Sequence, residues 1–257
     1  MKICTLASSS SGNCTLVHCG DTRLLIDAGL SRRRIKDSLG ELGLALDDID
    51  GIIITHCHTD HIKGLKMLIK YDSHPLYASC RASSAICREL PEAACRIRQF
   101  ESRQAFNVGS VRVIPFPTSH DSPGSSGFRL ESEGRILAFA TDLGIVTDEV
   151  LDGVLGADAA VVEANHDLTL LRNGPYPRPL KQRILSERGH LSNDDCGRLC
   201  TQLCRSGTRR IILAHLSKEN NTPACAYSAV NSALAEAGLT AELTVAPGDW
   251  PGEMIEV

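Results

Sequence analysis

The sequence has no hydrophobic run long enough to cross a bilayer, because charged residues interrupt its apolar stretches well before the ~20 residues that a transmembrane helix needs. It also has no N-terminal charged segment followed by a long apolar one, since the chain opens Met1-Lys2-Ile3-Cys4. A secretory signal requires that arrangement. The sequence therefore predicts a cytoplasmic protein without a membrane partner.

The chain also lacks an excess of positive charge, with 27 Lys and Arg against 31 Asp and Glu and a formal net charge of -4. Proteins that coat nucleic acid along their length are usually basic. Any binding of nucleic acid must therefore be local. With 257 residues, of which 42% are hydrophobic, the chain is expected to form one large domain over residues 1–257.

Cysteines are numerous, but their odd number of 11, the length of the chain and the missing export signal favour reduced thiols over disulfides. Cys196, Cys200 and Cys204 repeat every four residues, which places them on one face of a helix. Because Cys is a common buried residue, we interpret this stripe as core in preference to a metal or cluster site.

Short β-rich segments alternate with segments of helical periodicity, without a repeat of solenoid length or a low-complexity segment. This alternation indicates a mixed α/β fold with helices on the sheet faces. Two Pro- and Gly-rich stretches, 122–127 and 174–179, are interpreted as loops near a site. The predicted strands are 2–6, 14–18, 23–27, 51–55, 111–115, 127–132, 135–140, 159–163 and 210–214, with a further strand and helix within 75–90. The other predicted helices are 31–42, 62–70, 147–155, 192–205 and one that opens at Pro223.

The densest group of metal-ligand residue types is His56-Cys57-His58-Thr59-Asp60-His61, directly after a predicted apolar strand. In extended chain, residues two apart point the same way, so His56 and His58 can face one metal. Asp60 and His61 follow where the chain turns into a helix, and they can face a second metal. Four ligand-type residues within six positions make a chance histidine-rich loop a poor alternative. Imidazole and carboxylate ligands suit zinc, and also manganese or iron.

Three more candidate ligands, His120, Asp142 and His215, stand at the ends of later apolar runs. Taken singly, each is explained equally well as a polar residue at the start of a loop. Taken with the first cluster, they complete a dinuclear site. The prediction assigns one metal to His56, His58 and His120, the other to Asp60, His61 and His215, and a bridging position to Asp142.

Two divalent ions at such a site would favour an anionic substrate. Asp60, Asp142 and a hydroxide that bridges the metals cancel three of the four positive charges, so one remains. Metals about 3.5–4 Å apart activate the bridging water and clamp a phosphoryl oxygen. The expected substrate is therefore a phosphodiester or an ester, although the chain as a whole is acidic.

Other residues have candidate supporting roles. Asp27 ends a predicted strand and is either a hydrogen-bond acceptor for a ligand imidazole or a cap for the next turn. His190, just before a predicted helix, and His166, just after a strand, are candidates for binding a phosphate or protonating a leaving group. Their alternative is a structural role at partial burial, which is the role that we give to His18 and His74.

Seven segments spread over nearly the whole chain resemble the metallo-β-lactamase superfamily, and more narrowly its YycJ (WalJ) family. The histidine signature alone indicates the superfamily, whereas the Asn-His-Asp and Gly-His-Leu-Ser-Asn segments in this order are far more specific. Ribonuclease Z is similar at a greater distance, and its motif histidine before a helix corresponds in context to His190. The segments are Leu6-Ala7-Ser8-Ser9-Ser10-Ser11-Gly12-Asn13, Ile26-Asp27-Ala28-Gly29, Ile54-Thr55-His56-Cys57-His58-Thr59-Asp60-His61, Thr141-Asp142-Leu143-Gly144, Glu163-Ala164-Asn165-His166-Asp167, Arg188-Gly189-His190-Leu191-Ser192-Asn193 and Leu213-Ala214-His215-Leu216-Ser217.

The resemblance implies a four-layer αββα sandwich, with mixed sheets, helices on the outer faces and the site at one edge. It implies metal-dependent cleavage of phosphodiesters by a 5′→3′ exonuclease on DNA, with RNA as a further substrate. The two divalent ions would be zinc in the first place, with manganese or iron as alternatives. Cys57 departs from the pattern, because relatives often carry Glu there, but it lies between ligands.

On this reading His190 and His166 are the catalytic residues that act beside the metals. We expect Asn165, Ser192 and Lys218 to contact the substrate. The arginine run 32–34 is a further candidate for holding a strand, although such a run is usually a solvated face.

Two other functions are weighed against the nuclease. A thioesterase or lactonase of the glyoxalase II kind shares the seven ligands, but the two more specific segments argue against it. A non-catalytic regulatory metalloprotein would use its metals structurally, whereas a structural zinc site normally closes with four protein ligands. The spacing from Asp142 to His215 leaves no room for an inserted β-CASP domain, and no long Gly- and Pro-rich arm of the ribonuclease Z kind is present. Antibiotic-cleaving relatives usually carry a Cys ligand where Asp142 stands.

Overall fold

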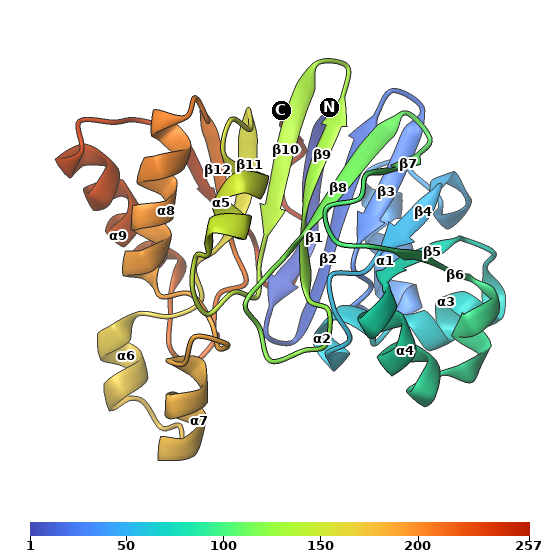
Figure 1. Ribbon diagram of the computed structural model, residues 1–257, viewed down its shortest axis with the longest axis horizontal. Helices are drawn as coiled ribbons and strands as arrows, with labels where there is room; N and C mark the ends of the chain where they lie inside the picture. The colour runs from blue at the N-terminus through green and yellow to red at the C-terminus, as the bar shows by residue number, and fades with distance from the viewer.

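Two seven-stranded sheets lie face to face in the computed structural model, which describes residues 1–257 (Figure 1). The first sheet is antiparallel over its first four strands and parallel over the rest. From one edge to the other it consists of β14 (Ile255–Glu256), β1 (Lys2–Ser9), β2 (Gly12–Cys19), β3 (Thr22–Ile26), β4 (Gly51–Ile53), β5 (Leu76–Ser79) and β6 (Ile97–Phe100).

The second sheet is also mixed, with four parallel strands at one end and antiparallel pairs at the other. Its order is β13 (Glu242–Val245), β12 (Arg210–Ala214), β11 (Ala159–Glu163), β10 (Arg135–Ala140), β9 (Ser126–Ser132), β8 (Val111–Pro117) and β7 (Phe106–Val108).

Helices cover the outer face of each sheet (Figure 1). The first sheet is covered by α1 (Arg32–Glu41), α3 (Leu65–Tyr71) and α4 (Cys80–Glu89), and the second by α5 (Asp148–Val154), α8 (Asn193–Arg205) and α9 (Pro223–Glu236). The short α2 (Thr59–Ile62), α6 (Leu168–Asn173) and α7 (Arg178–Ile184) lie at the sheet edge opposite the two termini, and single 3-10 turns occupy Leu46–Asp48 and Pro91–Cys95. The predicted four-layer αββα sandwich is confirmed.

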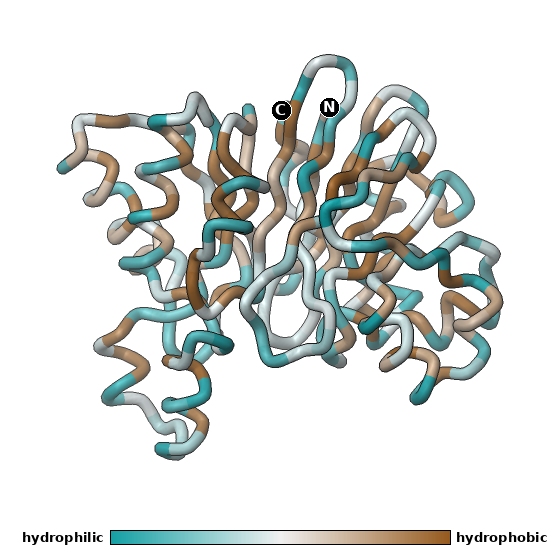
Figure 2. Tube along the Cα trace, in the orientation of Figure 1, coloured by the Kyte–Doolittle hydropathy of each residue, from teal (hydrophilic) through white to brown (hydrophobic).

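The apolar core has an inner layer between the sheets and an outer layer beneath each set of helices. Alternate residues of a strand point to opposite faces, so in β3 Leu24 and Ile26 belong to the inner layer while Leu25 packs under the helices. Phe128 and Val161 meet the inner layer from the second sheet. Figure 2 shows hydrophobic residues concentrated along the strands and hydrophilic residues in the connecting loops.

Cys196 and Cys200 lie on the buried face of α8 and Cys204 packs at the margin of the same core cluster, which confirms the predicted stripe. All 11 cysteines are free thiols. No helix in the structure is both long and apolar enough to span a bilayer.

The structure differs from the predicted elements at several places. The predicted helix 62–70 is interrupted before Leu65, because the backbone N of Gly64 donates outside the helix, to the Ala28 oxygen at 2.8 Å, so α2 ends at Ile62 and α3 begins at Leu65. The stretch 174–179 is only in part a loop, since it joins α6 to the first residues of α7. Strands β6, β7, β13 and β14 were not predicted.

The carboxyl ends of the parallel strands share one edge of the two sheets. Three candidate residues follow these strands within two positions: Asp27 after β3, Asp142 after β10 and His215 after β12. All three have left-handed backbone, with φ of 64°, 56° and 58°. Non-glycine residues rarely adopt this conformation, although Asp and His do so more often than most. Each strand therefore ends in a sharp turn at a candidate site residue.

Candidate metal centre

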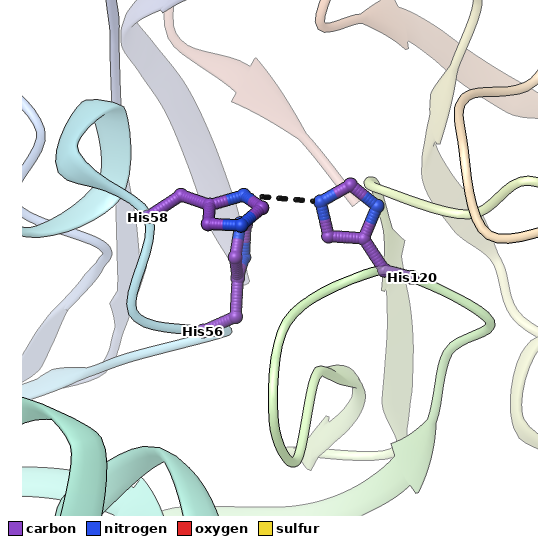
Figure 3. A group of neighbouring side chains, drawn as sticks. All are labelled: His56, His58 and His120. Carbon is purple, nitrogen blue, oxygen red and sulfur yellow. Dashed lines mark hydrogen bonds between the residues drawn. The ribbon is translucent and has the colours of Figure 1, made fainter. Parts of the chain in front are cut away.

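Three histidines from two loops face one another at this edge (Figure 3). His56 follows β4, His58 precedes α2, and His120 lies in the loop between β8 and β9. The Nδ1 atom of His58 lies 3.2 Å from Nε2 of His120, and the ring centroid of His56 lies 4.6 Å from that of His58 and 4.9 Å from that of His120. Their candidate ligand atoms all lie within 4.8 Å of one another, as a three-histidine metal site requires.

A second group of candidate ligands, Asp60, His61 and His215, lies beside the first, again with ligand atoms within 4.8 Å. Asp142 stands between the two groups. Its Oδ2 lies 3.5 Å from Nε2 of His61, and its Oδ1 lies 3.7 Å from Nε2 of His120 and 3.6 Å from Nε2 of His215. The structure thus brings all seven predicted ligands together, with Asp142 positioned to contact both groups.

Three polar atoms of this cluster are buried without a hydrogen-bond partner: Nε2 of His56, Nε2 of His215 and Oδ2 of Asp142. Buried polar atoms are almost always hydrogen-bonded, so three such atoms in one cluster indicate a missing partner. Imidazole nitrogens and carboxylate oxygens are ligands that zinc, manganese and iron accept. The residues therefore fit a pair of divalent cations.

The ionisation of these groups also fits cations. Burial opposes protonation of His61, but the carboxylates of Asp142 and Asp27 outweigh it and raise the pKa of His61 to about 10. Burial also opposes protonation of His215. Asp142 and Asp60 outweigh that effect and raise the pKa of His215 well above its usual value. Although burial pushes the pKa of Asp60 and Asp142 upward, His215 and His61 hold both below the usual range. The site therefore stores protons that a cation would displace.

Asp27 holds the ring of His61 in place through a hydrogen bond with the nitrogen that faces away from the other ligands. Its Oδ2 accepts a hydrogen bond from Nδ1 of His61 at 2.7 Å, and its Oδ1 accepts one from the backbone N of Thr55 at 2.8 Å. The Thr55 hydroxyl donates to the same carboxylate at 2.8 Å. An Nδ1–H held in this way turns Nε2 of His61 toward Asp142, so Nε2 is the nitrogen that would give up its proton and bind a cation.

Glu163 plays the corresponding part for His215, and the sequence reasoning did not select it as a site residue. It ends β11 and is fully buried. Its Oε1 accepts hydrogen bonds from Nδ1 of His215 and Nδ1 of His190, both at 2.8 Å, and its Oε2 accepts from the backbone N of Leu143 and Leu191, both at 3.0 Å. Burial raises the pKa of Glu163, but His190 and His215 more than reverse that shift. The only sequence signal was its place at the head of a family segment.

Asn13 is a second residue that the sequence reasoning missed. It lies in β2, after the serine-rich turn, and its Nδ2 lies 3.1 Å from Nε2 of His61 and 3.2 Å from Oδ2 of Asp60. Gly29 makes this approach possible, because a Cβ there would lie 1.6 Å from the backbone oxygen of Asp60 and 2.6 Å from the backbone N of Asn13. The turn after β3 and the start of β2 thus hold the Asp60 side of the site.

The two histidines predicted to be catalytic occupy different environments. His190 is 20% exposed and lines a cavity of about 150 Å³ beside the metal cluster. His166 is buried, does not line that cavity, and has no hydrogen-bond partner at either ring nitrogen. Burial and the charge of His190 lower the pKa of His166 to about 4, so its imidazole is neutral at pH 7. The structure therefore brings His190, but not His166, to the open side of the site.

The residues predicted to contact substrate are also placed differently from one another. Asn165 lines the same cavity, although its Nδ2 donates to the carbonyl of His215 at 2.9 Å. Ser192 is buried and caps α8, where its hydroxyl donates to Asp195 and accepts from the Asp195 backbone N. Lys218 is exposed and paired with Asp249 at 2.7 Å. Their contacts with substrate stay predictions.

The cavity beside the cluster opens between the metal ligands and the segment that carries α6 and α7. A larger cavity of about 460 Å³ lies at the far edge of the sheets, along β13 and β14. None of the predicted site residues lines the larger cavity. We therefore take the smaller cavity as the candidate substrate site, because it adjoins the candidate metal ligands. It is lined by Ser10, His120, Asp121, Asn165, Tyr176, Leu180, Arg183, Ile184, Gly189, His190 and Ser217.

Comparison with known proteins agrees with this architecture. Residues 22–216 match the Beta-lactamase superfamily domain. The chain is 36% identical over 241 residues to "Exodeoxyribonuclease WalJ" of Streptococcus pneumoniae, which covers 93% of this chain and 90% of that protein. It is also 36% identical over 236 residues to "Exodeoxyribonuclease YycJ" of Bacillus anthracis, with 91% and 89% covered.

The fold is shared with a solved structure at much lower identity. The metallo-β-lactamase fold protein YhfI from Bacillus subtilis superposes with a TM-score of 0.75 at 16% sequence identity, over 98% of each chain. The fold, the family match and the two relatives agree over most of the sequence. The chain therefore belongs to the beta-lactamase superfamily and is a homologue of WalJ and YycJ over nearly its whole length.

Proposed function

We propose that the chain is a metal-dependent phosphodiesterase that degrades DNA from a 5′ end, with RNA as a second substrate. The observation that carries this proposal is the cluster of seven imidazole and carboxylate ligands, with buried donor atoms that have no partner, beside an open cavity. The exodeoxyribonuclease activity in the names of the two relatives supports DNA as the substrate class. Zinc is our first candidate for the metal, with manganese and iron as alternatives.

When bound, a pair of divalent cations would supply an activated water and neutralise charge on the phosphoryl and leaving oxygens. His56, His58 and His120 would hold one cation, Asp60, His61 and His215 the other, and Asp142 both. The carboxylates of Asp27 and Glu163 fix the Nδ1–H tautomers of His61 and His215, so that Nε2 of each is turned toward the cluster.

His190 is our candidate for proton transfer or phosphate binding. Its Nδ1 is held at 2.8 Å by the buried carboxylate of Glu163, which fixes the orientation of the ring. With Nδ1 engaged, the opposite nitrogen is the one that would exchange a proton with a leaving oxygen or contact a phosphate oxygen in the cavity. His166, neutral and outside the cavity, is assigned to the same region in a supporting role.

Digestion of end-labelled DNA and RNA, single- and double-stranded, with zinc, manganese or no added metal tests the proposal. We expect metal-dependent loss of nucleotides from the 5′ end of DNA. His56→Ala and Asp142→Asn should abolish cleavage and lower the amount of bound metal, whereas His18→Gln, which alters a half-buried histidine whose ring bonds only to Gly20, should do neither. Wild-type rates from a metal-depleted His56→Ala protein would show that the site is assigned wrongly.

The rival activity is tested in the same preparation. A glyoxalase II-like thioesterase would hydrolyse a thioester substrate with metal while leaving labelled oligonucleotides intact. Inactivity of the metal-loaded protein toward both oligonucleotides and small esters would favour a regulatory metalloprotein.

A further inference from the structure

The segment 168–189, called here the α6–α7 lobe, has a charge opposite to that of the whole chain. It contains five basic residues and one acidic residue, Glu187, so its formal net charge is +4 while that of the chain is -4. Only Arg183 pairs with a carboxylate, and none of the other four takes part in an ion pair. The lobe is therefore a local positive surface on an acidic protein. Its basic residues are Arg172, Arg178, Lys181, Arg183 and Arg188.

One ion pair connects this lobe to the metal centre. Nε of Arg183 donates to Oδ2 of Asp121, and Oδ1 of the same carboxylate lies 3.5 Å from Nε2 of both His58 and His120. The two terminal nitrogens of Arg183 make no hydrogen bond, and the side chain is 53% exposed. Arg183 is thus fixed at one end beside the ligands and free at the other, in the geometry of an anion-binding guanidinium.

The lobe also forms one wall of the cavity beside the cluster. Tyr176, Leu180 and Arg183 face this cavity from the lobe, and His120 and His190 line its other side. Its volume of about 150 Å³ is well below the ~300–1,000 Å³ of most small-molecule sites. A cavity of this volume favours the entry of a single extended strand over that of a double helix.

Resting on the proposed nuclease function, we propose that the α6–α7 lobe holds a single-stranded end of the substrate and feeds it to the metals. Arg183 binds the phosphate next to the scissile bond, and Tyr176 provides an aromatic face for the adjoining base. Arg172, Arg178 and Lys181 contact the phosphates that follow. Single-stranded nucleic acid is generally held by this combination of cations that track the backbone and aromatic rings that stack on bases.

Salt dependence of binding tests the role of the cations. The probe is a 3′-fluorescein oligothymidylate with cleavage-resistant phosphorothioate linkages, bound to the metal-loaded full chain. Each phosphate contact on a single strand contributes about 0.7 to the slope of log K against log salt, so replacing Arg172, Arg178 and Lys181 with Gln should flatten the slope by about 2. The matched control replaces three exposed arginines away from the site, Arg88, Arg205 and Arg209, with Gln and should keep the wild-type slope.

Tyr176 tests the stacking contact with the same probe. Tyr176→Ala should weaken binding at least about fivefold, whereas Tyr176→Phe, which keeps the ring, should bind as wild type does. A lobe variant with the wild-type slope, a control variant with an equal loss, or a blunt duplex bound as tightly as the single strand would each overturn the inference. Because binding is measured without cleavage, these results do not depend on whether the protein cuts DNA. A wild-type protein that binds the probe but cannot cleave DNA would contradict the proposed function and leave this inference standing.

Discussion

Replacing Glu163 with Gln removes two hydrogen-bond acceptor sites from the centre of the site and leaves its shape almost unchanged. The carboxylate accepts four hydrogen bonds, two from imidazole Nδ1 atoms at Oε1 and two from backbone N–H groups at Oε2. An amide has only one oxygen. If that oxygen still accepts from His190 and His215, the amide NH₂ faces the N–H groups of Leu143 and Leu191. Four hydrogens then point at one another with no acceptor between them.

The size of the effect follows from burial. Leaving a buried donor unsatisfied costs about 1–3 kcal/mol. The backbone N–H groups of Leu143 and Leu191 would be two such donors, so their loss alone should lower the free energy of unfolding by about 2–6 kcal/mol. A typical domain has only ~5–15 kcal/mol to lose. The hold on the His215 tautomer also weakens, and loss of such a supporting partner lowers metal affinity by about 10–100-fold.

Two measurements check this prediction. Chemical denaturation of the metal-loaded protein gives the change in stability, and competition with a chromogenic chelator gives the metal affinity. Glu242→Gln is the control, because that carboxylate is 59% exposed and pairs with Arg210 on the surface, where a loss of no more than ~1 kcal/mol is expected. A Glu163→Gln protein that matches this control in stability and the wild type in metal affinity would refute the role given to the buried carboxylate.

Two other predictions concern the Asp60 side of the site. Metal affinity should rise with pH, by up to about tenfold per pH unit for each displaced proton, because the pKa of His61 is raised to about 10 and a cation must expel that proton at any lower pH. Chelator competition at pH 6 to 9 measures the slope of affinity against pH. A flat profile would contradict the reasoning. Gly29→Ala should destabilise the protein by about 1–3 kcal/mol through overlap with the Asp60 backbone. Gly40→Ala in α1, where no atom lies within 4 Å of the new Cβ, should be neutral or stabilising by up to about 1 kcal/mol, and equal melting temperatures for the two variants would count against the packing argument.

The sequence predicted which seven side chains gather at the site because each has a local signal. Four lie within six positions, and His120, Asp142 and His215 each end an apolar run. Strand ends in such a sandwich share an edge, so these positions were expected to meet. Glu163 has no comparable signal, since its partner His215 is 52 residues away and a carboxylate at the end of a buried strand has many possible uses.

The α6–α7 lobe shows a different kind of failure. Pro175, Pro177 and Pro179 indicate a loop, because proline interrupts a helix that has already begun. At the first turn of a helix, however, the missing N–H costs nothing and the fixed φ is favourable. α7 begins at once after Pro177, with Pro179 in its first turn. Arginines 32–34 were candidates for holding a strand, but the Arg32 side chain is bound to Asp72. In the α6–α7 lobe, by contrast, Arg183 lies beside the metal ligands through its ion pair with Asp121.

The left-handed turns at Asp27, Asp142 and His215 affect how this site should be tested. An L-residue in that conformation costs about 1–2 kcal/mol, and Asp, Asn and His are among the residues that bear it best. Two of the turns are anchored through the backbone N of the residue itself, which donates to the Ile53 oxygen at 2.8 Å in Asp27 and to the Ser8 hydroxyl at 2.7 Å in His215. Alanine at position 142 would therefore combine backbone strain with the loss of a metal ligand. Asparagine tolerates the turn while it removes the charge and one ligand oxygen, so Asp142→Asn attributes lost activity to the metal centre. A folded Asp142→Asn protein that binds less metal and does not cleave is the result that the dinuclear assignment requires.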